Sequence, residues 1–161
     1  MRVIRGEGDG AGVRIAIVAA RFHEVVTTAL LDGALAASAQ AGVADDDITV
    51  AWVPGAFEIP QTARALADTR RYDAIIALGV VIRGGTPHFD YVCRGLTDGL
   101  RDVMQATGVP VAFGVLTTDD VDQALERAGG KDGHKGVEAV QAALEMAHLR
   151  AALAAPPQDE P

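Results

Sequence analysis

The sequence predicts an α/β protein in which a parallel β-sheet of four strands is covered by helices on both faces. Two observations predict this fold class: strand-like apolar runs alternate four times with helical patterns, and one of these runs is almost uniformly apolar. Such alternation is typical of right-handed β-α-β units, and a fully apolar strand is expected where both faces of the sheet are covered. A chain of 161 residues, 49% of them hydrophobic, is sufficient for the core of one domain.

The first half of the chain predicts two strands, each followed by a helix. Residues 13–19 form the first apolar run, and a helix of about 18 residues follows it, with apolar side chains at three-and-four spacing up to about Gly42. The second run is 48–53, which stops at Pro54-Gly55, because this dipeptide lacks an amide hydrogen and favours a turn. A helix is then expected from about Glu58 to Asp68.

The second half of the chain continues the alternation and ends with two consecutive helices. Residues 119 and 120 are aspartates, which suit the first turn of a helix because they accept hydrogen bonds from its free amides and offset its dipole. The predicted elements are a strand at 74–82, a helix from the end of the loop 83–87 to about residue 107, a strand at 109–116, a helix closing at Gly129-Gly130, and a helix from about residue 136 to about residue 153.

These elements predict a flavodoxin-like three-layer sandwich in one domain over residues 13–154. The polar, glycine-rich segment 1–12 is expected to be flexible, and the proline-rich tail 155–161 to be disordered. No apolar run reaches the roughly 20 residues that span a bilayer, so no membrane partner and a cytoplasmic location are expected. The one cysteine, Cys93, excludes an intramolecular disulfide and is interpreted as a small buried apolar residue.

Charge and missing motifs exclude several classes of function. The chain has 14 basic and 22 acidic residues and a net charge of −8, so nucleic-acid binding is not expected. It has no GxSxG motif, no Walker loop and no HExxH helix, which excludes serine hydrolases, nucleotide triphosphatases and zinc proteases of those types.

Ligands of doubly wound sheets bind at the carboxyl ends of the strands, so functional residues are sought at 20–23, 54–58, 81–88 and 113–117. The segment 83–88 combines two glycines, Thr86, a proline and His88 at the mouth of a helix, where backbone amides and the Thr86 hydroxyl could hold a phosphate. His88 could transfer protons near neutral pH. The alternatives are an ordinary loop and a surface or capping histidine.

Five further residues carry chemical interest, each with a structural alternative. Glu58 could accept hydrogen bonds from a polyhydroxyl chain, or only offset a helix dipole. Phe22 and Phe113 could stack on a flat heterocycle, or belong to the core. Arg127 and Lys135 could contact a phosphate, or be solvated surface residues.

Read together, five ordered motifs resemble the lumazine synthase family from about residue 13 to about residue 150. The motifs are Ala20-Arg21-Phe22, VPGAFEIP at 53–60, ALGVVIRGGTPHFDYV at 77–92, GVLTT at 114–118 and ERAG at 126–129. Two positions depart from the pattern. His23 stands where many members have Asn, which leaves the polarity of the pocket open, and Ala56 stands where others have Ser, although a backbone contact would survive that change.

The resemblance implies a transferase of riboflavin biosynthesis. It would condense a ribitylamino-pyrimidinedione with 3,4-dihydroxy-2-butanone 4-phosphate to 6,7-dimethyl-8-ribityllumazine, with no metal or redox cofactor. In the implied site, Phe22 stacks on the pyrimidinedione ring, and the backbone of Val80, Val81 and Ile82 contacts the edge of this ring. The ribityl chain is held by Ala56, Phe57 and Glu58. Gly85, Thr86 and Arg127 bind the phosphate, and His88 is the proton shuttle.

The resemblance also implies assembly. Family members build the pocket between adjacent subunits of a pentameric ring, so Phe113, Arg127 and Lys135 are expected to come from the neighbour. The short connection 129–136 resembles members whose pentamers form 60-subunit icosahedral shells, and riboflavin synthase is a candidate partner. Two other readings are a non-catalytic flavin- or lumazine-binding protein or shell scaffold, and a flavodoxin-like regulatory domain, which would need acidic residues where Ala19-Ala20-Arg21 stands.

Overall fold

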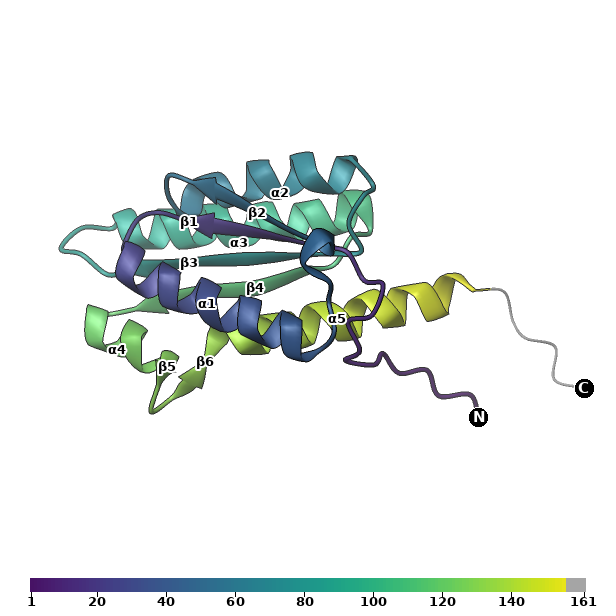
Figure 1. The fold of residues 1–161 in the computed structure, drawn as a ribbon. Helices are drawn as coiled ribbons and strands as arrows, with labels where there is room; N and C mark the ends of the chain where they lie inside the picture. The colour runs from purple at the N-terminus through teal and green to yellow at the C-terminus, as the bar shows by residue number, and fades with distance from the viewer. Residues whose placement is uncertain (156–161) are drawn as a thin grey trace, which may run out of the picture.

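The computed structural model describes residues 1–155 and has the predicted layered architecture (Figure 1). Within these residues, four parallel strands form one sheet in the order β2-β1-β3-β4, and a short antiparallel pair, β5-β6, lies apart from it. The elements are β1 (Ile15–Ala20), α1 (Glu24–Gln40), β2 (Ile48–Val53), α2 (Ile59–Asp68), β3 (Ala74–Ile82), α3 (His88–Thr107), β4 (Val111–Thr118), α4 (Val121–Glu126), β5 (Ala128–Gly130), β6 (Gly133–His134) and α5 (Lys135–Ala154), with 3-10 turns at Asp45–Asp47 and Ala56–Glu58.

Two apolar layers fix the helices on opposite faces of the sheet. Ile15 and Ile17 of β1 belong to a buried cluster with α1 and α5, whereas Ala16 and Val18 belong to a second cluster with α2 and α3. Successive side chains of a strand point to opposite faces, so one fully buried strand can supply both layers. The flavodoxin-like three-layer sandwich is therefore confirmed (Figure 1).

The strand register brings the loops that carry the sequence motifs to one end of the sheet. The last residue of β1, Ala20, pairs with Val53 at the end of β2, and Ile82 at the end of β3 pairs with Thr118 at the end of β4. Arg21 then donates its amide to the Val53 carbonyl (2.9 Å). The segments after β1, β2 and β3 consequently emerge side by side, as doubly wound sheets require.

The chain between α4 and α5 differs from the prediction. The helix expected to close at Gly129-Gly130 ends at Glu126, and residues 128–134 form the hairpin β5-β6. Gly129 and Gly133 have positive φ (109° and 92°), a conformation that glycine adopts without the steric cost of a side chain. The connection stays short, but it is an ordered hairpin in place of a plain loop.

The fourth strand also begins later than predicted, at Val111 instead of Val109. Gly108 ends α3 in the left-handed conformation (φ 69°), and Val109 donates its amide to the Thr107 hydroxyl (3.2 Å). Pro110 offers only its carbonyl, which accepts from Ile75 (2.9 Å). Residues 109 and 110 are thus buried and apolar, like a strand, but they serve the turn.

Several contacts hold the end of the N-terminal segment against the domain. The Gly10 amide donates to the Ala41 carbonyl (2.8 Å), and His148 Nε2 lies 2.7 Å from the Asp9 carbonyl. Of the predicted disordered tail 155–161, residues 156–161 lie outside the described residues. None of the helices within residues 1–155 has the length and apolar character needed to cross a bilayer.

Candidate functional site

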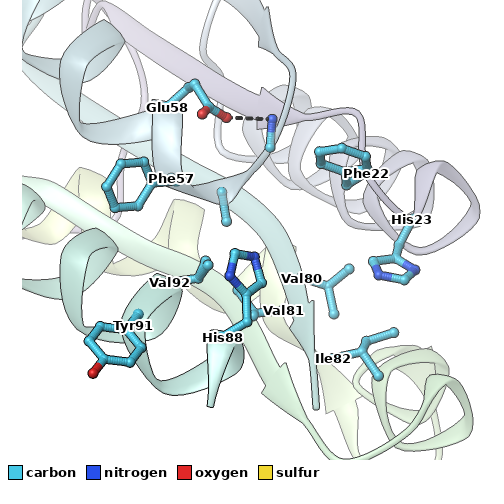
Figure 2. Close-up of a pocket in the computed structure, with 12 residues that line it drawn as sticks. Phe22, His23, Phe57, Glu58, Val80, Val81, Ile82, His88, Tyr91 and Val92 are labelled. Carbon is cyan, nitrogen blue, oxygen red and sulfur yellow. Dashed lines mark hydrogen bonds between the residues drawn. The ribbon is translucent and has the colours of Figure 1, made fainter. Parts of the chain in front are cut away.

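A pocket of about 600 Å³ opens at the carboxyl end of the sheet, between the starts of α1 and α3 and the turn that precedes α2 (Figure 2). Its lining residues are Phe22, His23, Gly55, Ala56, Phe57, Glu58, Val80, Val81, Ile82, His88, Tyr91 and Val92. The pocket brings together eight residues predicted for the site, those at 22, 56–58, 80–82 and 88. It lies where the strand-end argument places a ligand.

Phe22, Gly55 and Glu58 form one packed unit on the wall of the pocket. Glu58 Oε2 accepts a hydrogen bond from the Gly55 amide (2.9 Å), and the Phe22 amide donates to the Pro54 carbonyl (3.1 Å). A β-carbon at Gly55 would lie only 2.7 Å from the Phe22 ring and 3.2 Å from Glu58 Oε2, so a side chain there would displace the ring or the carboxylate. Figure 2 shows this hydrogen bond as a dashed line that starts at the Glu58 carboxylate, and the Phe22 ring lies beyond its other end.

Glu58 has capacity left for a ligand. The side chain is half-buried, and Oε1 has no protein partner among the described residues. Glu58 ends a 3-10 turn directly before α2, where the positive end of the helix dipole favours a carboxylate. The turn thus offers a fixed acceptor for hydroxyl groups.

The backbone of His23 has a conformation that most residues other than glycine avoid. Its backbone is left-handed (φ 60°, ψ 52°) at the start of α1, and its carbonyl accepts from the amides of Val26 (3.0 Å) and Thr27 (3.1 Å). Among residues other than glycine, Asn, Asp and His are enriched in this conformation, so His23 can adopt it more readily than most side chains. Its imidazole lines the pocket, so the ring adds a polar group there.

His88 begins α3 and faces the same pocket, across it from Phe22 and His23 (Figure 2). Pro87 precedes it and accepts the amide of Asp90 (3.0 Å), which closes the first helical turn. Tyr91 and Val92, three and four residues later, also line the pocket and were not predicted as site residues. Their helical spacing from His88 is the signal that could have identified them.

The last residues of β3 form the floor of the pocket. Val80 and Val81 are almost fully buried, and Ile82 is half-buried. β3 continues its ladder with β4 as far as Ile82, so this backbone is rigid up to the rim. A flat ligand lying on the floor would meet apolar side chains and a fixed backbone edge.

The remaining predicted residues lie outside this lining. Gly85 and Thr86 are in the exposed loop between β3 and α3, next to His88 in sequence. Phe113 lies on the edge strand β4, 42% exposed. Arg127 follows α4, and Lys135 begins α5.

Arg127 and Lys135 are each held by acidic groups of their own chain. Arg127 Nη1 donates to the Gln123 carbonyl (2.9 Å) and lies 3.3 Å from Asp132 Oδ2. Lys135 Nζ pairs with Glu138. Both pairs are partly exposed, so an arriving anion can compete for these cations at small energetic cost.

Cys93 lies one turn beyond Asp90 on α3 and packs against the α2–α3 cluster. Burial raises the pKa of its thiol, and the negative charge of Asp90 raises it further. The thiol therefore stays protonated at neutral pH and packs as a small apolar side chain, but it is half-buried and not fully buried as predicted. Within residues 1–155, no three His, Cys, Asp or Glu side chains gather as potential metal ligands.

Comparison with known families identifies the chain. The model of the 6,7-dimethyl-8-ribityllumazine synthase family matches residues 12–151. The chain belongs to this family. The match runs from before β1 to residue 151 of α5 and includes every residue that lines the pocket.

Membership of the lumazine synthase family supports a role in riboflavin biosynthesis. It implies a transferase activity on small-molecule substrates and an oligomeric protein. The predicted resemblance is thereby confirmed. Three of the five motifs on which it was based contribute residues to the lining of the pocket.

Proposed function

We propose that this lumazine synthase family member condenses 5-amino-6-ribitylamino-2,4-pyrimidinedione with 3,4-dihydroxy-2-butanone 4-phosphate to 6,7-dimethyl-8-ribityllumazine. The observation that carries the proposal is the convergence of Phe22, Glu58 and His88 on one pocket of about 600 Å³. That volume lies within the range of small-molecule sites.

Each wall of the pocket suits one part of the first substrate. The exposed Phe22 ring (67% accessible) offers a face for the pyrimidinedione, and the β3 backbone at 80–82 offers donors and acceptors for its edge. Ala56, Phe57 and Glu58 stand where the ribityl chain would lie, with Glu58 as hydroxyl acceptor. These contacts would hold the reacting amine in place.

The phosphate of the second substrate is assigned to the loop 83–87. Gly85 and Thr86 are exposed, and a β-carbon at Gly85 would meet no atom within 4 Å, so the backbone is open to a ligand. The same loop leads into α3, whose amino end favours an anion. This arrangement would place the phosphate beside His88.

The reaction begins when the 5-amino group attacks the ketone and loses water to form an imine. Loss of a proton from the adjacent carbon then expels inorganic phosphate, and the resulting enol converts to a ketone. The ribitylamino nitrogen attacks this ketone, and loss of a second water closes the ring. His88 accepts and returns the protons, while alignment of the two substrates contributes on the order of several kcal/mol.

We further propose that an adjacent subunit of a pentamer completes the site with Phe113, Arg127 and Lys135. The pocket is open on one side, and Phe22, Phe57 and Tyr91 on its rim are each at least 60% exposed. A neighbour would cover these aromatic side chains and add a cation for the phosphate. The pentamers are in turn proposed to form a 60-subunit shell. Light scattering that showed only particles of five subunits would contradict this assembly.

An assay of the purified protein with both substrates, followed by lumazine fluorescence, tests the proposed activity. His88→Ala is expected to slow turnover about 10²-fold or more, as loss of an acid-base group does, with pyrimidinedione affinity within about threefold of the parent. His88→Ala at the parent rate would contradict the proton-shuttle role. Lumazine binding without turnover by the parent would instead support the non-catalytic binding protein.

A further inference from the structure

The loop that is proposed to hold the phosphate is exposed along its whole length. Residues 83–88 are all exposed, and β-carbons at Gly84 and Gly85 would meet no atom within 4 Å. His88 nevertheless has to face the pocket at a fixed position, because proton transfer requires hydrogen-bond reach. The start of α3 therefore needs a support outside the pocket.

Arg83 provides contacts on both sides of this loop. Its backbone amide donates to the Thr118 carbonyl at the end of β4 (2.9 Å). Its guanidinium binds Asp119 in the β4–α4 turn (Nε to Oδ1, 3.1 Å) and Asp90 in the first turn of α3 (Nη1 to Oδ1, 3.5 Å). The guanidinium carbon also lies 4.1 Å from the centroid of the Phe89 ring.

These contacts reach the two residues that directly follow His88. Phe89 is half-buried against the α2–α3 cluster, and Asp90 Oδ1 receives the guanidinium. A rotation of the first turn of α3 that withdrew His88 from the pocket would have to break both contacts. One exposed ion pair would resist this weakly, but a planar guanidinium with two carboxylates and an aromatic ring defines a single geometry.

We propose that Arg83 is a positioning residue, which fixes the first turn of α3 against the β4–α4 turn and so holds His88 and the loop 84–87 in register with the pocket. This role rests on the proposed function, because it concerns the same reaction. Arg83 does not need to touch the substrate, since its guanidinium is already engaged by Asp90 and Asp119.

Arg83→Gln and Asp119→Ala, singly and combined, test the clamp in the assembled full-length protein. Each single change is expected to lower kcat at least 10-fold, with lumazine affinity within about threefold of the parent. The double variant is expected to be no slower than Arg83→Gln alone, because both changes remove the same contact. Arg83→Lys should recover only part of the rate, since an ammonium cannot bridge both carboxylates in one plane.

Arg101→Gln is the matched control. Arg101 is also on α3, is similarly exposed, and pairs with Asp98 (3.2 Å) and Asp102 (3.2 Å), but it lies beyond the pocket lining. Its loss should leave kcat within twofold of the parent. An Arg83→Gln variant that runs at the parent rate would overturn the proposal. The proposal would also fail if the single variant Arg83→Gln were inactive while the single variant Asp119→Ala ran at the parent rate, because Arg83 would then act on the substrate itself.

Hydrogen exchange provides a measurement that does not depend on turnover. The amides of Asp90 (3.0 Å) and Tyr91 (3.4 Å) donate to the Pro87 carbonyl and report the first turn of α3. Their exchange should be at least 10-fold faster in Arg83→Gln than in the parent and in Arg101→Gln, and equal rates would overturn the clamp. If the parent itself made no lumazine, the proposed function would fail while this measurement still decided the role of Arg83.

Discussion

The absence of a side chain at Gly55 leaves room for the Phe22 ring and the Glu58 carboxylate in the wall of the pocket. The φ angle is −144°, which any residue can adopt, so glycine is required here by space and not by backbone conformation. The Phe22 ring and the Glu58 carboxylate both lie close to the position that a β-carbon would take, at 2.7 Å and 3.2 Å. The aromatic face of Phe22 and the carboxylate of Glu58 are thus set relative to each other by one small residue.

Gly55→Ala is therefore expected to weaken pyrimidinedione binding about 10-fold, or roughly 1.4 kcal/mol, because the added methyl group displaces Phe22 or Glu58. Isothermal titration with the pyrimidinedione measures this effect. Gly8→Ala is the control, since a β-carbon there meets nothing within 4 Å. An unchanged affinity in Gly55→Ala would show that the pocket tolerates a shifted ring.

At the scale of elements, predictions succeeded best where turn-forming residues limit an apolar run. The bounds of β2 and β3 match the predicted runs, because long apolar stretches ended by turn residues have few alternatives. The hairpin β5-β6 was missed, because its strands have only three and two residues and carry no alternating pattern. The start of β4 was wrong because Val109 and Pro110 are buried without belonging to the ladder.

The pocket was predictable to the extent that it follows from strand ends. Phe22, Glu58 and Ile82 are located by the ends of β1, β2 and β3, and all three line it. Tyr91 required knowledge of the direction in which a helical side chain points. The roles of residues expected from a neighbouring subunit, such as Arg127, stay predictions, because no pattern within one chain specifies which surfaces meet.

Close packing of α1 on α5 depends on Gly136, the second residue of α5. A β-carbon there would lie 2.1 Å from the Leu30 carbonyl oxygen, a backbone atom that cannot turn away. Gly136→Ala is expected to lower the free energy of unfolding by about 2 kcal/mol, because overpacking outweighs the roughly 1 kcal/mol gained in helix propensity. Urea unfolding followed by circular dichroism measures the change.

Gln141→Ala separates the two contributions to that change. Gln141 is exposed on the same helix, so its replacement alters helix propensity without touching α1. It should leave stability within about 0.5 kcal/mol of the parent. A Gly136→Ala variant as stable as Gln141→Ala would mean that the two helices can separate without cost.

At the scale of the whole molecule, the pocket of one chain is open and is bordered by exposed aromatic side chains. Phe22, Phe57 and Tyr91 expose 67%, 60% and 73% of their surface, and large aromatic side chains gathered around one opening are typical of a surface covered by a partner. The cation proposed for the phosphate, Arg127, lies after α4 and outside the pocket lining of its own chain. Both features are accounted for if each site is built from two subunits.

Complementation between two impaired variants distinguishes a site shared by two chains from a site within one chain. If His88 and Arg127 act in one site from different chains, unfolding and refolding a 1:1 mixture of His88→Ala and Arg127→Ala creates sites in which both residues are intact. Random assembly in a closed ring gives roughly one such site in four, so the mixture should recover about a quarter of the parent activity. Each variant refolded alone is the control and should keep only its own reduced activity. A mixture no more active than its components would mean that both residues serve a site within one chain, because a self-contained site never regains the residue its own chain has lost.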